Sequence, residues 1–138
     1  MKRKLAYIAG PLFTPAERKY LEEIEKAVSE CGYETYLPHR DAGLFLAGIN
    51  ESKKFFDKDS EKIKESNVVI AVLNGADVDS GTAWEIGFAY SNGIKIFGIL
   101  DDTRKISVNA LNPMIVNSMT KIVKNVEELK QNLKDSII

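Results

Sequence analysis

The chain has 138 residues, of which 44% are hydrophobic and 28% charged, and its formal net charge is −1. These values are typical of one soluble globular domain, here residues 1–138, that buries roughly 68% of its unfolded surface. The low net charge argues against a nucleic-acid or anionic-membrane partner. We find neither a secretory signal nor an apolar run long enough to span a membrane, so we expect a cytoplasmic protein.

The first half of the chain alternates strand and helix patterns. Thr14, Pro15 and Glu17 form a capping box with proline at the first helical position, which is a strong helix start. Leu21 and Ile24 begin the buried stripe of this helix, which ends before Gly32. In order, this half predicts a strand at 4–9, the helix from Pro15, a strand at 34–37, a polar loop at 38–41 and an amphipathic helix at 51–66.

The second half begins with the apolar run Val68–Leu73, which indicates a buried strand. An acidic, glycine-containing loop follows, and Asp79 or Ser80 can cap the next helix. In order, we expect the strand at 68–73, a helix at 80–92, a strand at 95–100, a loop to Asn112, a weak strand at 120–123 and a last helix after Asn125. Alternating strands and helices predict an α/β fold with a parallel sheet, helices on both faces and the strand order 2-1-3-4-5.

Several familiar sites are missing from the sequence. We find no P-loop, no G-x-G-x-x-G after the first strand and no G-x-S-x-G elbow. With Cys31 as the only cysteine and His39 as the only histidine, an intrachain disulfide and a Cys/His zinc site are excluded. Four aspartates carry oxygen ligands that suit Mg²⁺, but acidic residues are common in such loops, and we expect neither a metal ion nor a cofactor. They are Asp57, Asp59, Asp77 and Asp79.

Aromatic and acidic side chains converge on the carboxyl edge of the predicted sheet, where small ligands bind in α/β folds. Tyr7 lies in the first strand, Phe13 in the loop after it, Asp59 on the second long helix, and Asp79 and Glu85 at the start of the third. Two carboxyl groups are what retaining glycosyl transfer requires, one as nucleophile and one as acid. The helix N-terminus is expected to favour Glu85 as an anion. The set therefore suits nucleoside chemistry.

Four segments carry a resemblance that covers nearly the whole chain in order: Tyr7–Thr14, Leu37–Asp41, Asp59 and Asp79–Gly87. Together they resemble the nucleoside 2-deoxyribosyltransferase family. The resemblance implies a flavodoxin-like fold, a nucleophile at Glu85, aspartates that handle the base at Asp59 and Asp79, and a tyrosine near the nucleophile at Tyr7. It also implies a homo-oligomer, because an Asn-x-Met segment of the family, matched loosely by Asn112 and Met114, reaches a neighbouring subunit's active site.

The expected site therefore has two parts. The catalytic residues are Glu85, Asp79, Asp59 and Tyr7, and the substrate-binding residues are Gly10, Phe13, Asp41, Gly81, Asn112 and Met114. The expected partners are a deoxynucleoside and a free nucleobase. Purely structural roles compete for some positions: Asp79 as a helix cap, Asp59 as a solvated charge, Tyr7 as core filling, and Asp41 as part of a solvated loop.

Two other functions stay open. A sister group of 2′-deoxynucleoside 5′-monophosphate N-hydrolases shares fold and nucleophile, and its first loop resembles Gly-Ser-Ile-Arg-Gly-Gly, which would hold a phosphate. Here the apolar loop Gly10–Thr14 lacks arginine, and its Gly10 to Phe13 part is expected to exclude water, which favours transfer to a base, with hydrolysis as a slow side reaction. A non-catalytic nucleotide-binding module is the other alternative, and the intact Glu85 argues against it.

Overall fold

The computed structural model describes residues 3–43, 51–105 and 110–137 and contains a five-stranded, fully parallel sheet. The strand order is β2-β1-β3-β4-β5, as the sequence predicts. The strands are β1 (Leu5–Ala9), β2 (Glu34–Tyr36), β3 (Val68–Val72), β4 (Lys95–Ile99) and β5 (Lys121–Val123). Every residue of β3, the central strand, is buried, which explains its unbroken apolar sequence.

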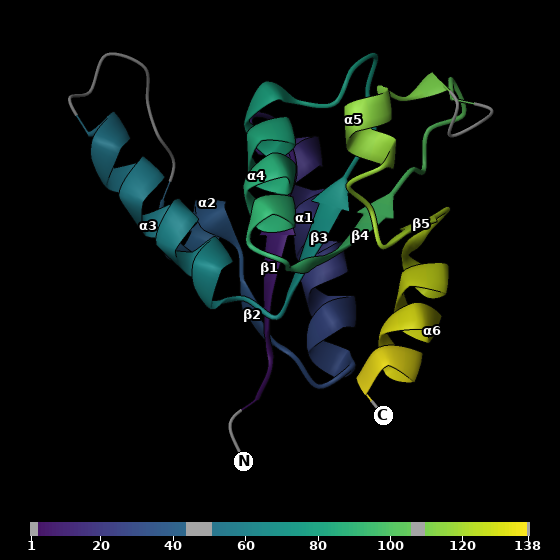
Figure 1. Ribbon diagram of the computed structural model, residues 1–138, viewed down its shortest axis with the longest axis horizontal. Coiled ribbons are helices and arrows are strands. Elements are labelled where there is room, and N and C mark those ends of the chain that lie inside the picture. Colours follow the sequence, from purple (N-terminus) through teal and green to yellow (C-terminus); the bar gives the residue numbers. More distant parts are fainter. Residues whose placement is uncertain (1–2, 44–50, 106–109, 138) are drawn as a thin grey trace.

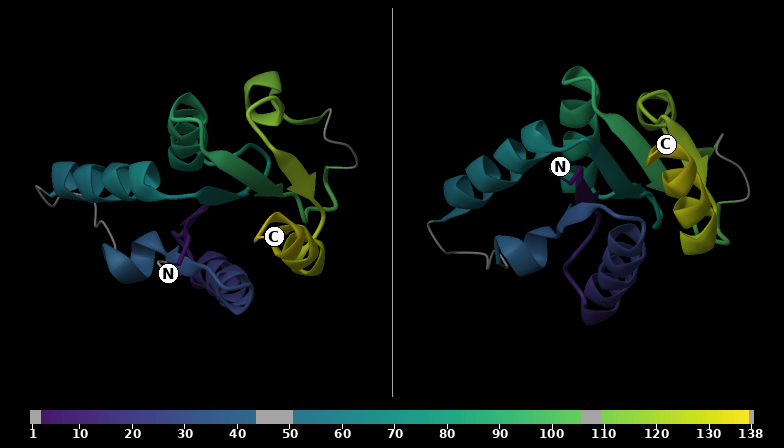
Figure 2. Two further views of the ribbon diagram at one scale, coloured as in Figure 1. Left: turned by 60° about the horizontal axis from the view of Figure 1, so that its bottom comes forward. Right: turned by 90° about the horizontal axis from the view of Figure 1, so that it is seen from below.

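Helices cover both faces of this sheet (Figures 1 and 2). One face carries α1 (Pro15–Glu30) and α6 (Val126–Ile137), which pack around Ile24, Val28 and Leu129. The other face carries α3 (Ser52–Glu65), α4 (Ser80–Ser91) and α5 (Pro113–Val116), with Ile63, Ile86 and Ile115 in its core. Among the described residues, no helix is long and apolar enough to cross a membrane.

Local sequence signals fix most helix ends. The predicted capping box is present at α1, where Thr14 accepts a hydrogen bond from the Glu17 N–H and Glu17 accepts one from the Thr14 N–H. Asn125 caps α6 by accepting a hydrogen bond from the Glu128 N–H at 2.8 Å, at the position where the sequence predicts the start of the last helix. Strands and helices end within one or two residues of their predicted limits.

Two segments that the sequence pattern assigned to loops are short helices. Pro38–Asp41 forms α2, because Pro38 occupies the first helical position and the Asp41 carboxylate accepts a hydrogen bond from the Leu37 N–H at 2.8 Å. The apolar segment around Met114 forms α5, where Asn112 accepts from the Met114 N–H at 2.9 Å. Both were missed because one helical turn is too short to show an apolar period.

Candidate active site

Glu85 lies in the second turn of α4 and turns its side chain back toward the sheet. The fully buried Tyr7 of β1 donates a hydrogen bond from its hydroxyl to Glu85 Oε2. The two residues are 78 positions apart in the chain, so the packing of α4 on β1 and β3 creates this contact. The nucleophile candidate is thus held by a tyrosine that the sheet itself positions.

Asp79 is the N-cap of the same helix. Its Oδ2 accepts hydrogen bonds from the Thr82 N–H at 3.0 Å and from the Thr82 hydroxyl at 3.1 Å. A Cβ on Gly81 would lie 3.3 Å from that same oxygen, so glycine keeps the approach to the carboxylate open. The Asp79 carboxylate therefore both caps the helix and lines the site, and its Oδ2 is already hydrogen-bonded to the helix.

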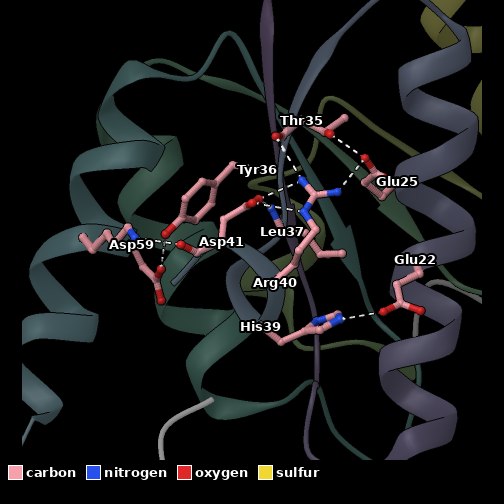
Figure 3. A network of polar contacts seen from close by, with 10 residues as sticks. Glu22, Glu25, Thr35, Tyr36, Leu37, His39, Arg40, Asp41 and Asp59 are labelled. Carbon is pink, nitrogen blue, oxygen red and sulfur yellow. Dashed lines mark hydrogen bonds and ion pairs between the residues drawn. The ribbon is translucent and has the colours of Figure 1, made fainter. Parts of the chain in front are cut away.

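Asp59 comes from α3 and faces the same region. The hydroxyl of Tyr36, the last residue of β2, donates a hydrogen bond to Asp59 Oδ1 at 2.9 Å (Figure 3). Tyr36 is directly opposite Tyr7 in the parallel pairing of β1 and β2, and the two rings stack with centroids 5.4 Å apart. Two neighbouring tyrosines therefore each contact a different carboxyl group.

A cavity of about 350 Å³ joins these groups at the carboxyl edge of the sheet. This volume is of the size that small-molecule sites have. Its acidic lining is Asp59, Asp79 and Glu85, and its aromatic lining is Phe13, Phe56 and Trp84. The remaining lining residues are Gly10, Leu12, Pro38, Ser60, Ile63 and Gly81.

Burial determines the protonation of the two central carboxyl groups. It raises the pKa of Glu85 to about 8; the negative charges of Asp59 and Asp79 add to the rise, and the hydrogen bond from Tyr7 opposes it. Burial also raises the pKa of Asp59, against the hydrogen bond from Tyr36 and the nearby charge of Lys58. The helix N-terminus is expected to favour the Glu85 anion, whereas burial acts in the opposite direction and raises the pKa of this group.

Phe13 lies at the rim of the cavity and is 68% exposed. The apolar loop of Gly10 to Phe13 therefore does not enclose the cavity within one chain, although the sequence led us to expect that it excludes water. Trp84 is half-exposed, stacks on Phe88 with centroids 4.9 Å apart and meets Phe56 edge-on at 5.2 Å. Its indole thus packs and lines the cavity at once.

Three predicted binding residues lie away from this cavity. Asp41 accepts hydrogen bonds from Arg40 and from the Leu37 N–H, which hold its pKa low despite partial burial, and its carboxylate points toward Arg40 (Figure 3). Asn112 and Met114 line a separate hollow of about 800 Å³ between α4 and α5. Within one chain, these two side chains do not meet Glu85.

Sequence reasoning overlooked Tyr36, Phe56, Ser60 and Ile63 around the site. One signal was available for Tyr36: a second tyrosine, beside Tyr7, in the adjacent strand of the predicted sheet. The sequence contained no such signal for Phe56, Ser60 and Ile63, because the packing of α3 over the sheet decides which of its side chains line the cavity beside Asp59.

The cavity lies at the carboxyl ends of the parallel strands and is lined by acidic side chains. This arrangement is typical of an α/β enzyme that binds a small molecule. The family model described as nucleoside 2-deoxyribosyltransferase matches residues 6–134, and the chain belongs to that family. No curated protein sequence gives a significant match.

Solved structures with this fold cover nearly the whole chain. A conserved protein from Enterococcus faecalis V583 is 25% identical, with 98% of this chain and 99% of that one covered and a TM-score of 0.83. A 2-deoxyribosyltransferase from Bacillus psychrosaccharolyticus is 23% identical, with 94% and 95% covered and a TM-score of 0.78. A CMP N-glycosidase from Clostridium botulinum is 22% identical, with 94% and 98% covered and a TM-score of 0.61.

Proposed function

We propose that this protein transfers 2-deoxyribose between nucleobases through a covalent ester on Glu85. The observation that carries the proposal is the Glu85 carboxyl group at the cavity wall, held by the Tyr7 hydroxyl and accompanied by a second carboxyl group on Asp59. A carboxylate nucleophile splits one difficult displacement at an acetal carbon into two easier ones. Family membership supports this chemistry.

In the first step, a Glu85 oxygen attacks C1′ and the bond from C1′ to the base nitrogen breaks. The electron pair of that bond goes to the base, which takes a proton from Asp59. In the second step, an incoming base gives its proton to Asp59 and attacks C1′, and Glu85 leaves as a carboxylate. Two inversions restore the original configuration at C1′.

Asp59 is the candidate for the proton donor in this site. Burial raises the pKa of Asp59, so its proton is retained to higher pH. Asp79 Oδ2 already accepts hydrogen bonds from the Thr82 N–H and hydroxyl, so that oxygen is occupied by the helix cap. We therefore assign Asp59 to proton transfer and Asp79 to substrate binding, with Gly10, Gly81 and the rings of Phe13 and Trp84 shaping the pocket.

Deoxyribosides should react much faster than ribosides at this site. The transition state is oxocarbenium-like, and an electron-withdrawing 2′-hydroxyl would destabilise its positive charge. The absence of that hydroxyl lowers the barrier without any contact from the protein.

Hydrolysis is the second candidate, and the exposure of Phe13 favours it. The glycosyl ester on Glu85 partitions between a bound base and water, and a cavity that is open in one chain admits water. We expect the acceptor base itself, stacked against Phe13 and Trp84, to displace that water. The lack of an arginine in the Gly10–Thr14 loop argues against a seat for a 5′-phosphate.

An exchange assay separates these activities. The protein is incubated with deoxyinosine and free adenine, and the products are resolved by chromatography. We expect deoxyadenosine as the main product and free sugar as the minor one. Faster cleavage of deoxynucleoside monophosphates, with no exchange product when base is added, would instead establish the hydrolase.

We also propose that the active form is a homo-oligomer in which Asn112 and Met114 complete a neighbour's site. Met114 is 79% exposed and Tyr90 is 60% exposed at the hollow between α4 and α5, which is unusual for apolar side chains of a monomer.

Met114→Glu should therefore dissociate the oligomer and lower activity together, because it places a charge in an apolar contact. Sedimentation velocity and the exchange assay, run at one protein concentration, measure both. Ser29→Glu, on the exposed side of α1, is the matched control and should change neither. A fully active monomer at assay concentration would contradict the proposal.

A further inference from the structure

Tyr36 connects the two halves of the site. It ends β2, is buried, stacks on Tyr7 at 5.4 Å between centroids and donates to Asp59 Oδ1 at 2.9 Å. The ammonium group of Lys62 lies 5.9 Å from the centre of its ring. The strand register, the stacked Tyr7 ring and this cation together restrict movement of the Tyr36 ring.

A hydrogen bond from Tyr36 constrains where Asp59 can carry a proton. Burial and the negative charge of Asp59 raise the pKa of Tyr36, so the hydroxyl remains a donor at every working pH. In a neutral carboxyl group one oxygen only accepts and the other carries the proton. Because Oδ1 already accepts from Tyr36, the proton belongs on Oδ2.

We propose that Tyr36 is a positioning residue that fixes the rotamer of Asp59 and places its transferable proton on Oδ2. This inference rests on the proposed function, in which Asp59 protonates the departing base. Tyr7 and Tyr36 then have parallel tasks: one holds the nucleophile and the other holds the acid. The stacked pair sets the relative placement of both groups from two adjacent strands.

Tyr36→Phe tests the inference, because it removes the hydroxyl and keeps the ring. Each variant is assayed with deoxyguanosine, whose base leaves with a proton from the enzyme, and with 7-methyl-2′-deoxyguanosine, whose cationic base leaves as a neutral molecule without one. We expect kcat for deoxyguanosine to fall about 10- to 100-fold with KM nearly unchanged, and kcat for the methylated substrate to stay within about 3-fold. Deoxyuridine and 5-fluorodeoxyuridine, a better leaving group, form the corresponding pyrimidine pair.

Tyr33→Phe is the matched control, because Tyr33 is also buried but packs in the cluster on the opposite face of the sheet. It should leave both substrates at wild-type rates. A Tyr36→Phe variant that behaves like Tyr33→Phe overturns the inference. An equal loss on both substrates also overturns it, since the hydroxyl would then serve Glu85 or the fold rather than the acid.

A double variant adds an independent readout. If Tyr36 acts through Asp59, adding Tyr36→Phe to Asp59→Asn should cost little more than Asp59→Asn alone. Multiplicative losses would show that Tyr36 acts elsewhere. Failure of the proposed function itself looks different: wild-type protein would then release base from neither substrate pair, or Glu85→Gln would retain full activity.

Discussion

Replacing Glu85 by glutamine should lower turnover of deoxynucleosides by at least about 1,000-fold, because the covalent route disappears with the anionic nucleophile. Glutamine keeps the shape of the side chain and can still accept the hydrogen bond from Tyr7. Nucleoside binding, measured by calorimetry, should therefore change only a few-fold. Glu85→Ala is a poorer test, since water can enter the vacated space and attack C1′.

The stability of Glu85→Gln serves as its control. The folded-state pKa of Glu85 is raised to about 8, so its neutral form stabilises the fold at low pH, and that contribution is lost as the pH rises through about 8. Glutamine never ionises, and the variant should thus be more stable than wild type at pH 9, by an amount on the order of a few kcal/mol. Glu61→Gln, on the exposed side of α3, should match wild type in activity and stability. Near-normal turnover in Glu85→Gln would remove Glu85 from the mechanism.

The pH dependence of kcat/KM should be bell-shaped for unmodified nucleosides. Glu85 and Asp59 face one cavity and interact, so the pair titrates as a unit, and the reactive form carries a single proton, on Asp59. Activity should rise through the lower pKa of the pair and fall through the upper one, near 8. With 7-methyl-2′-deoxyguanosine no acid is needed, and activity should instead rise through pH 8 to a plateau.

Tyr7→Phe extends this pH test. The hydrogen bond from Tyr7 lowers the pKa of Glu85, so its removal should move the alkaline limb for unmodified nucleosides to higher pH. The control is again Tyr33→Phe, which should leave the limb near 8. If activity with the methylated substrate falls at high pH in the same way, then the group that loses its proton there is not the acid that protonates the base.

The sheet could be predicted from sequence because β3 is buried on both faces and reads as an uninterrupted apolar run, while caps such as Thr14 and Asn125 mark the helix starts. The short helices α2 and α5 were not predicted, for a physical reason. Each is a single turn that begins with a proline and contains one side-chain hydrogen bond to the backbone, from the Leu37 N–H to Asp41 in α2 and from the Met114 N–H to Asn112 in α5, and neither feature leaves a periodic pattern.

The position of Asp79 and Glu85 at the cavity could be predicted from the sequence, because one loop and the helix after it carry both residues. The electrostatics of the site could not be predicted, because the pKa of Glu85 depends on burial by segments distant in sequence. The contact between Tyr36 and Asp59 likewise depends on how α3 crosses the sheet. Asn112 and Met114 line a separate hollow of the same chain, and their proposed role depends on the oligomer proposed above.

The proposed mechanism requires a deoxyribosyl ester on Glu85, which mass spectrometry of the acid-quenched protein can detect. After brief mixing with a deoxynucleoside and no acceptor base, a fraction of the protein should gain the mass of one deoxyribosyl group, located on the peptide that contains Glu85. Added adenine should remove this species and yield deoxyadenosine. Steady release of free base with unmodified protein at every quench time, or a label on another residue, would contradict the account.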